Sequence, residues 1–525
     1  MSWFIFRNNT LEPFFGKGYS FSGYDDISVI PAEAEGYVWF FQVPMGIELP
    51  VMAQTIEGYR QKFEYVLGQI GDSKPVLALT LEPLYEVPLV GSDFSLREAV
   101  DGYNASLREV AKNHNNLKII DFSDFVRRYQ PSGLLDWRFY FISQMGLNPK
   151  LARDFQAWWN RQVEGIALKR KKCLVLDLDN TLWGGVLGED GPSGIKVGGD
   201  YPGKAFHFFQ EALLALSKTG VILTICSKNN ESDVEEVWQK NPFLVLKKEH
   251  FAATRINWND KASNIKELAS ELNIGLDSFV FVDDNPTERE LVRQMLPMVS
   301  VPEFPAQPYG LPDFFKELVD SYFRVYAVTD EDRNKAAQYK ANAERAKAQQ
   351  GFSDFGAFLE SLDIQLTISE ADEFNIPRIA QMTQKTNQFN LTTRRYTESD
   401  IRSFLERGWK IWCLSVADKF GDSGITGAIM VNGDEIDTLL LSCRILGKGI
   451  EKAFLTRVLA RLKDQGIKSV KARYIPTAKN SQVAGFYDRA GFSQLSAAGL
   501  QEGEKLYCAD LETIDLQIDS YYHIN

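Results

Sequence analysis

The stretch Cys173-Leu174-Val175-Leu176-Asp177-Leu178-Asp179-Asn180-Thr181 decides the fold of the middle of this 525-residue chain. Its first four residues form a short apolar run of the kind that makes a buried strand. Side chains alternate between the two faces of a strand, so the sequence predicts that Asp177 and Asp179 point to the same side as the strand ends. An isolated pair of this kind commonly caps a helix or faces solvent, so its function depends on what the rest of the chain brings beside it.

Two further apolar runs, residues 221–227 and 278–285, also end in polar side chains. The first ends at Ser227 and the second at Asp283 and Asp284, while Lys261 opens an amphipathic helix between them. The carboxyl ends of parallel strands meet at one edge of a sheet, where ligands bind. We therefore expect four acids, one hydroxyl and one lysine to converge there.

This combination of side chains is typical of phosphoryl transfer. Asp177 is the expected carboxylate nucleophile, and Asp179 is the expected general acid and base. Ser227 and Lys261 would hold the transferring phosphoryl group and offset its charge. Carboxylate oxygens suit Mg²⁺, for which the sequence offers four candidate ligands: Asp177, Asp179, Asp283 and Asp284.

In order and residue type, these four segments resemble the four motifs of the haloacid dehalogenase (HAD) superfamily. Residues 177–191, with 227–230 and 283–286, are similar to the FkbH-like subfamily. That resemblance implies a glyceryl transferase and phosphatase of polyketide pathways. Such an enzyme takes 1,3-bisphosphoglycerate, forms a glyceryl thioester on a cysteine, removes the phosphate and loads an acyl carrier protein. The short segments around Lys261 leave no room for a large cap domain, and the glycine-rich residues 184–203 are expected to form a flap.

The last third of the chain is expected to be an α+β domain. Residues 438–443 read as a strand, a helix begins near Gly449, and Asn432-Gly433-Asp434 predicts a hairpin. Residues 444–449, with Asn480 and 486–492, resemble the acyl-coenzyme A motifs of GNAT acetyltransferases. The resemblance implies that the ligand, a phosphopantetheine arm of a carrier protein or coenzyme A itself, contacts five residues: Arg444, Gly447, Gly449, Asn480 and Tyr487.

A glyceryl thioester needs a cysteine, and the sequence offers two candidates. Cys443 precedes the glycine-rich helix start, where a thiolate gains from the helix dipole, and Cys226 adjoins Ser227. Spacing alone does not choose between them; the helix dipole favours Cys443 and leaves Cys226 open. The five cysteines are scattered without a CxxC pair, so neither a disulfide framework nor a zinc site is indicated.

The first third alternates strand-like and helical segments, which predicts an open α/β sheet. Residues 136–140 faintly resemble the SGNH hydrolase fold, but residues 6–10 stand where that family has its serine block, and no histidine follows Asp136 at triad spacing. We expect a domain without hydrolase activity, used for packing or docking.

Length and composition indicate a folded enzyme of several domains. We expect an SGNH-like domain at 1–165, a HAD-type doubly wound parallel sheet at 166–325, a helical connector at 326–355 and a GNAT-like domain at 356–525. The net charge of −12 disfavours nucleic acid as a partner, and the absence of a long apolar run or a signal sequence indicates a cytoplasmic protein without membrane spans. The small phosphorylated substrate and the acyl carrier protein are the expected partners.

Two functions remain open on this evidence. The first is a Mg²⁺-dependent HAD enzyme that loads a dephosphorylated glyceryl group onto an acyl carrier protein. The second is a HAD phosphatase fused to an acetyl-coenzyme A-dependent N-acyltransferase that acts on an amino sugar or a similar amine.

Overall fold

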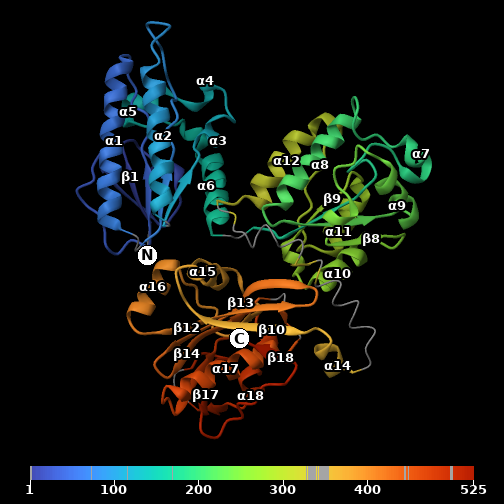
Figure 1. Cartoon of the computed structure of the whole chain (residues 1–525). Helices are drawn as coiled ribbons and strands as arrows, with labels where there is room; N and C mark the ends of the chain where they lie inside the picture. The colour runs from blue at the N-terminus through green and yellow to red at the C-terminus, as the bar shows by residue number, and fades with distance from the viewer. Residues whose placement is uncertain are drawn as a thin grey trace. The chain divides into compact units, whose positions relative to one another are not determined.

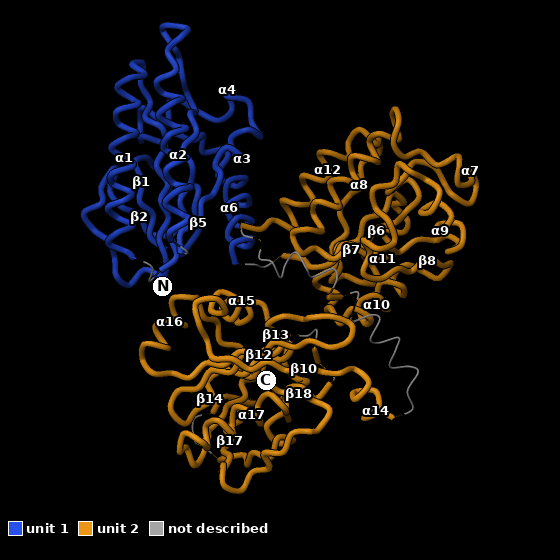
Figure 2. Tube along the Cα trace, in the orientation of Figure 1, with its two compact units in different colours: residues 1–167 blue, residues 168–525 orange. Residues whose placement is uncertain are grey.

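The computed structural model divides the chain into two compact units, residues 1–167 and residues 168–525 (Figure 2). It describes residues 3–71, 74–114, 116–167, 170–326, 328, 338–339, 341, 354–442, 445–446, 448–496 and 500–525. Most of the expected connector lies outside these ranges. No helix within them has the length and apolar character that crossing a membrane requires.

The first unit is an open α/β domain built on one parallel sheet (Figure 1). Its strand order is β2-β1-β3-β4-β5, an order known from doubly wound folds. Helices α1 and α2 pack on one face, and α6 covers the other, where Phe155 stacks on Phe40 of β3. The elements are β1 (Trp3–Arg7), β2 (Tyr19–Tyr24), β3 (Tyr37–Phe40), α1 (Leu49–Ile70), β4 (Val76–Leu79), α2 (Ser95–Asn113), β5 (Leu117–Ile120), α3 (Ser123–Val126), α4 (Pro131–Leu134), α5 (Trp137–Ser143) and α6 (Ala152–Ile166).

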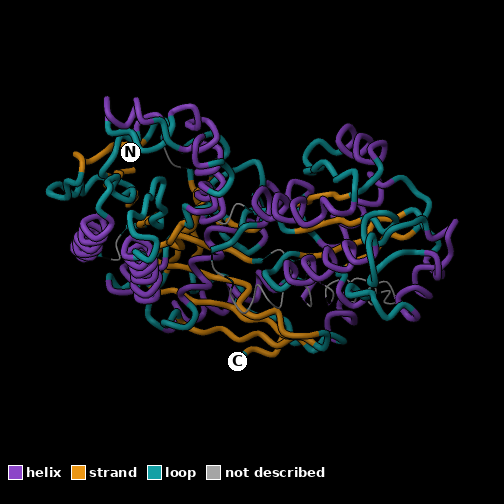
Figure 3. The backbone as a smooth tube through the Cα atoms, turned by 90° about the horizontal axis from the view of Figure 1, so that it is seen from above, coloured by secondary structure: helices purple, strands orange, loops and turns teal. Residues whose placement is uncertain are grey.

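The second unit begins with a four-stranded parallel sheet in the order β8-β7-β6-β9, which places β6 between β7 and β9. Helices α8 and α9 bury apolar side chains on one face, and α10 and α11 on the other. Figure 3 shows strands in orange with the helices that flank them in purple. The elements are β6 (Cys173–Leu176), α7 (Leu187–Gly194), α8 (Gly203–Ser217), β7 (Ile222–Ser227), α9 (Glu231–Lys240), β8 (Ala253–Ile256), α10 (Lys261–Leu272), β9 (Phe279–Val282), α11 (Pro286–Met295) and α12 (Leu311–Leu318).

The segment between β6 and α8 forms the expected flap. Gly184 and Lys196 pair their backbones in both directions at 2.9 and 2.8 Å, and the loop that they close contains the short helix α7. A cavity of about 700 Å³ lies between residues 192–203 and residues 236–243 at the end of α9.

The rest of the second unit is a largely antiparallel sheet in the order β16-β17-β15-β14-β13-β12-β10-β18. Helices α15 and α16 pack on one face and α17 on the other. The elements are α14 (Phe355–Glu360), β10 (Ile364–Glu370), α15 (Ile376–Lys385), β11 (Phe389–Asn390), α16 (Glu398–Glu406), β12 (Lys410–Asp418), β13 (Gly421–Asn432), β14 (Glu435–Leu441), α17 (Ile450–Asp464), β15 (Ser469–Tyr474), α18 (Phe486–Arg489), β16 (Ser493–Leu495), β17 (Lys505–Asp510) and β18 (Tyr522–Ile524).

Two local predictions for this part of the chain are confirmed. Asn432 pairs with Glu435 across a tight hairpin in which Gly433 has a φ of 61°. Gly449, with a φ of 71°, directly precedes α17. Both positions need the left-handed conformation that glycine adopts without strain.

Candidate functional site

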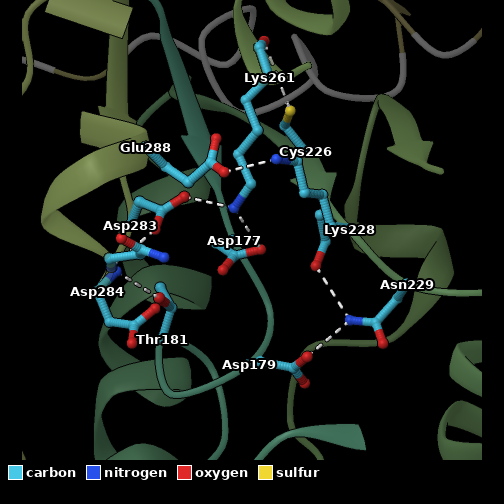
Figure 4. A network of polar contacts seen from close by, with 12 residues as sticks. Asp177, Asp179, Thr181, Cys226, Lys228, Asn229, Lys261, Asp283, Asp284 and Glu288 are labelled. Carbon is cyan, nitrogen blue, oxygen red and sulfur yellow. Dashed lines mark hydrogen bonds and ion pairs between the residues drawn. The ribbon is translucent and has the colours of Figure 1, made fainter. Parts of the chain in front are cut away.

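The carboxyl edge of the parallel sheet gathers three of the predicted site residues. Asp177 directly follows β6, Asp283 directly follows β9, and Lys261 is the first residue of α10. The Lys261 ammonium lies 3.1 Å from the Asp177 carboxylate and 2.5 Å from that of Asp283 (Figure 4). All three side chains are buried, so little water screens these charges.

Asp177, Asp283 and Asp284 each offer a carboxylate oxygen, and these oxygens lie within 4.8 Å of one another. Burial raises the pKa of Asp284 to about 6, and burial together with the charge of Asp177 raises the pKa of Asp283. Burial opposes the charge of Lys261, but Asp177 and Asp283 hold the pKa of the ammonium above its usual value. One lysine does not balance three carboxylates, and this set of hard oxygen donors fits Mg²⁺.

Asp179, which the sequence analysis included among the Mg²⁺ ligands, does not share that carboxylate cluster. Its Oδ1 accepts hydrogen bonds from Trp183 Nε1 at 2.8 Å and from the backbone N–H of Leu187 at 3.0 Å. The strand ends at Leu176, and the chain turns at Asn180 with a φ of 51°, so the alternation of a strand no longer sets the direction of Asp179. The flap holds this carboxylate beside the cluster, where a general acid is needed.

Asn229 is a site residue that the sequence analysis gave no role. Its Nδ2 donates to Asp179 Oδ2 at 3.0 Å and to Ser227 Oγ at 3.2 Å, so it links the predicted acid to the predicted hydroxyl (Figure 4). Its place two residues after Ser227, at the end of a buried strand, is the signal that could have identified it.

The backbone of the Asp283-Asp284 turn is held by two further side chains. Thr181 Oγ accepts from the Asp284 N–H at 3.1 Å. Arg289 Nη1 donates to the carbonyl oxygens of Asp283 and Asp284 at 2.9 and 2.7 Å. These bonds orient the two carboxylates before any ligand arrives.

Cys226 is turned away from the site. It precedes Ser227 in β7, so its side chain lies on the opposite face, where it packs with Ala262 and Ile265 of α10. Its Sγ lies 3.8 Å from the carbonyl oxygen of Lys261, and burial raises the pKa of the thiol to about 12. A buried thiol of this kind is a poor nucleophile, which corrects the inclusion of Cys226 among the catalytic candidates. The other candidate, Cys443, lies outside the described residues, as do Arg444 and Gly447.

The residues predicted to contact a pantetheine arm follow β14 and β15 in the chain. These parallel strands pair at Glu435–Lys471 and Ile436–Ala472 and then separate. The gap beyond is filled by the chain itself, because β11 pairs with Leu440 and Leu441 of β14. Leu391 extends this bridge: its N–H donates to Leu439 of β14 at 3.1 Å, and its carbonyl accepts from Ile475 at 2.8 Å. We call residues 389–392 the inserted segment.

Asn480 and Tyr487 were predicted to face a pantetheine arm, and both are engaged elsewhere. Asn480 Nδ2 donates to the carbonyls of Asn390 and Ile475 at 3.0 and 2.9 Å. Tyr487 is 1% exposed and packs against aromatic rings, and burial raises the pKa of its hydroxyl. The third residue, Gly449, keeps an exposed position at the start of α17. Long-range pairing of the inserted segment, which local motifs do not reveal, explains the contacts of Asn480, whereas Tyr487 is buried among nearby aromatic rings.

In the first unit, Asp136 caps α5 by accepting from the N–H of Arg138 at 3.1 Å. Asn8, which follows β1, hydrogen-bonds to the backbone of Gln42 and to Tyr59. Both observations describe structural hydrogen bonds, and the resemblance to SGNH hydrolases stays a prediction.

Comparison with known proteins supports the reading of the parallel sheet. Residues 172–308 match the model of the NLI interacting factor-like phosphatase family. No curated protein matches the chain. The chain is similar to the crystal structure of the N-terminal part of the protein BF1531 from Bacteroides fragilis, which contains a phosphatase domain complexed with Mg. The two are 26% identical with a TM-score of 0.54, over 62% of this chain and 94% of that one.

Two acetyltransferase structures also match a part of the chain. They are the ribosomal-protein-S18-alanine N-acetyltransferase of Escherichia coli and a GNAT superfamily phosphinothricin acetyltransferase of Sinorhizobium meliloti in complex with acetyl-coenzyme A. Each is 15% identical with a TM-score of 0.22 over 28% of this chain, and the match covers 94% and 88% of those chains.

Residues 172–308 therefore form a phosphatase domain of the HAD type. The HAD prediction is confirmed for this part of the chain, and the FkbH-like specificity stays a prediction.

Proposed function

We propose that this chain is a Mg²⁺-dependent phosphatase and glyceryl transferase, which converts 1,3-bisphosphoglycerate into a dephosphorylated glyceryl thioester and loads it onto an acyl carrier protein. The observation that carries the phosphatase part is the contact of Lys261 with both Asp177 and Asp283. Asp179 is separate from this contact, because the backbone N–H of Leu187 in the flap donates a hydrogen bond to its carboxylate.

The chemistry assigns different tasks to the two aspartates of the first motif. An Asp177 carboxylate oxygen attacks phosphorus, the bond from phosphorus to the leaving oxygen breaks, and Asp179 gives its proton to that oxygen. Asp179 then takes a proton from water, whose oxygen attacks the phosphorus of the aspartyl phosphate and releases inorganic phosphate. The hydrogen bond from Asn229 orients Asp179 for both proton transfers.

The charges around Asp177 favour this reaction. Lys261 offsets negative charge on the phosphoryl group, and the Ser227 hydroxyl, beside Asn229, can donate to a phosphoryl oxygen. Mg²⁺ held by Asp177, Asp283 and Asp284 would supply further neutralisation of the phosphoryl oxygens.

The transfer part rests on the resemblance to FkbH-like proteins. A cysteine thiol attacks the acyl carbon of the acyl phosphate, the bond from that carbon to the phosphate oxygen breaks, and inorganic phosphate leaves. The carrier's pantetheine thiol then attacks the acyl carbon of the thioester and releases the cysteine thiol. Because Cys226 is buried and faces away from Asp177, Cys443 is the thiol that we nominate for this step.

Mass spectrometry of a phosphopantetheinylated carrier protein tests the proposal. The carrier is incubated with the intact protein, 1,3-bisphosphoglycerate and Mg²⁺, and we expect a mass gain equal to an unphosphorylated glyceryl group. Cys443→Ala should abolish the gain, and Cys226→Ala, the matched control, should retain it. No gain with the unaltered protein would refute the transferase part, while release of phosphate in the same sample would leave the phosphatase part standing.

The alternative is a HAD phosphatase fused to an acetyl-coenzyme A-dependent N-acyltransferase that acts on an amino sugar or a similar amine. The inserted segment occupies the gap between β14 and β15 and bears equally on coenzyme A and on the pantetheine arm of a carrier protein, so it does not distinguish the two functions.

A further inference from the structure

A second lysine of the HAD domain stands at the phosphatase site, and the chemistry described above does not use it. Lys228 directly follows Ser227, and its ammonium lies 2.6 Å from a carboxylate oxygen of Glu288, in the first turn of α11. Figure 4 shows the two side chains meeting from opposite sides of the site.

The strand order places this ion pair across the mouth of the site. Lys228 continues from β7, and Glu288 belongs to the helix that follows β9. Because β6 lies between β7 and β9, a contact between these two residues passes over the end of β6. The residue at that end is Asp177.

The two lysines differ in what they can offer to a substrate. The Lys261 side chain is 4% exposed and is paired with two aspartates of the cluster, whereas that of Lys228 is 37% exposed. Lys228 has a single carboxylate partner within the described residues, and an incoming anion can compete for its ammonium. A partly buried ammonium binds a carboxylate or phosphate more strongly than one in open water does.

We propose that Lys228 selects substrates whose leaving group carries a second anionic group, a carboxylate or a second phosphate. This inference rests on the proposed phosphatase function and names the substrate class of that site. With one phosphate at Asp177, the second anion of the same molecule takes the place of the Glu288 carboxylate at Lys228. Glu288 neutralises the ammonium when no substrate is bound.

Two commercially available phosphomonoesters form a matched pair for the test. 3-Phosphoglycerate carries a carboxylate where glycerol 3-phosphate carries a hydroxymethyl group. We expect the unaltered protein to favour 3-phosphoglycerate in kcat/KM. In Lys228→Met, the ratio of the two kcat/KM values should fall roughly tenfold or more toward 1, since a charge-assisted contact is lost. Lys228→Arg should keep most of the preference.

Glu288→Gln is a second variant, and we expect it to increase the preference for 3-phosphoglycerate that Lys228→Met decreases. Removal of the competing carboxylate should lower the KM for 3-phosphoglycerate more than the KM for glycerol 3-phosphate. Lys240→Met is the matched control, because Lys240 forms a similar ion pair with Glu236 on the exposed side of α9.

Binding measurements separate this inference from the proposed function. Calorimetry of both phosphomonoesters on the Asp177→Asn protein reports affinity without turnover. A preference for 3-phosphoglycerate that Lys228→Met removes would support the role of Lys228, even if the unaltered protein hydrolysed neither compound. Equal affinities in the Asp177→Asn protein, or an equal loss for both compounds on adding Lys228→Met, would overturn it.

Discussion

The side-chain amide of Asn480 donates to the backbone carbonyl of Asn390, 3.0 Å away, and both residues are buried. This bond ties the loop after β15 to the inserted segment, which also pairs with β14. The gap between β14 and β15 is therefore closed by hydrogen bonds of the chain itself. A ligand with an extended arm has to replace these bonds before it can occupy the gap.

Coenzyme A should bind weakly to the intact protein for this reason. Titration calorimetry with acetyl-coenzyme A should show no saturation at concentrations up to about 1 mM, which corresponds to less than about 4 kcal/mol of binding free energy. Saturable binding at micromolar concentration would show that the inserted segment leaves the gap readily and would support the N-acyltransferase alternative.

Asn480→Ala should destabilise the third sheet. The substitution removes the donor for the carbonyl of Asn390, which is buried, and for that of Ile475, which is partly buried. The expected cost is about 1–3 kcal/mol in the free energy of unfolding, seen as a lower denaturant midpoint. Glu502→Ala, at an exposed position of the same sheet region, is the control and should leave that midpoint within experimental error. An unchanged midpoint for Asn480→Ala would mean that the amide contributes little.

Asp177→Asn should abolish phosphatase activity while the fold is kept. The amide cannot attack phosphorus, and we expect kcat to fall at least about 1000-fold. Phosphate release from p-nitrophenyl phosphate measures the activity, and circular dichroism checks the fold. Substantial retained activity would exclude Asp177 as the nucleophile.

Mg²⁺ should stabilise the protein more at pH 8 than at pH 5. The pKa of Asp284 is raised to about 6, and that of Asp283 is also raised, so both acids gain protons in the metal-free protein as the pH falls through this range. A raised pKa in the folded state means that the metal-free fold loses stability as the pH rises through it. Mg²⁺ requires the deprotonated carboxylates and removes this penalty.

The increase in melting temperature on adding Mg²⁺, measured at both pH values, checks this expectation. A protein with both Asp283→Asn and Asp284→Asn should show little Mg²⁺-dependent increase at either pH. An equal increase for the unaltered protein at pH 5 and pH 8 would contradict the link between these acids and the metal.

Much of the phosphatase site could be predicted from local sequence. The apolar runs that became β6, β7 and β9 each end at a polar residue, and parallel strands bring such ends to one edge. The meeting of Asp177, Asp283 and Lys261 follows from that rule. The direction of Asp179 does not, because the chain leaves the strand after Leu176, and hydrogen bonds from the flap and Asn229 orient the carboxylate.

Side chains alternate along a strand, so two adjacent residues that the sequence analysis both listed as catalytic candidates point to opposite faces of β7. Cys226 and Ser227 are neighbours in β7, but one packs under α10 and the other lies beside Asn229. Which of them faces the site depends on the register of β7 against its neighbours. That register is a property of the assembled sheet.

By itself, the sequence determined that the middle of this chain carries the residues of a HAD-type phosphatase in the right order, because strand ends and helix starts depend on nearby residues. Only the tertiary structure decided what lies between β14 and β15. The motif residues after these two strands resemble an acyl-coenzyme A site, but the inserted segment comes from about 50 residues earlier in the chain. Its backbone hydrogen bonds form only when distant strands are already side by side, so no local sequence pattern predicts them.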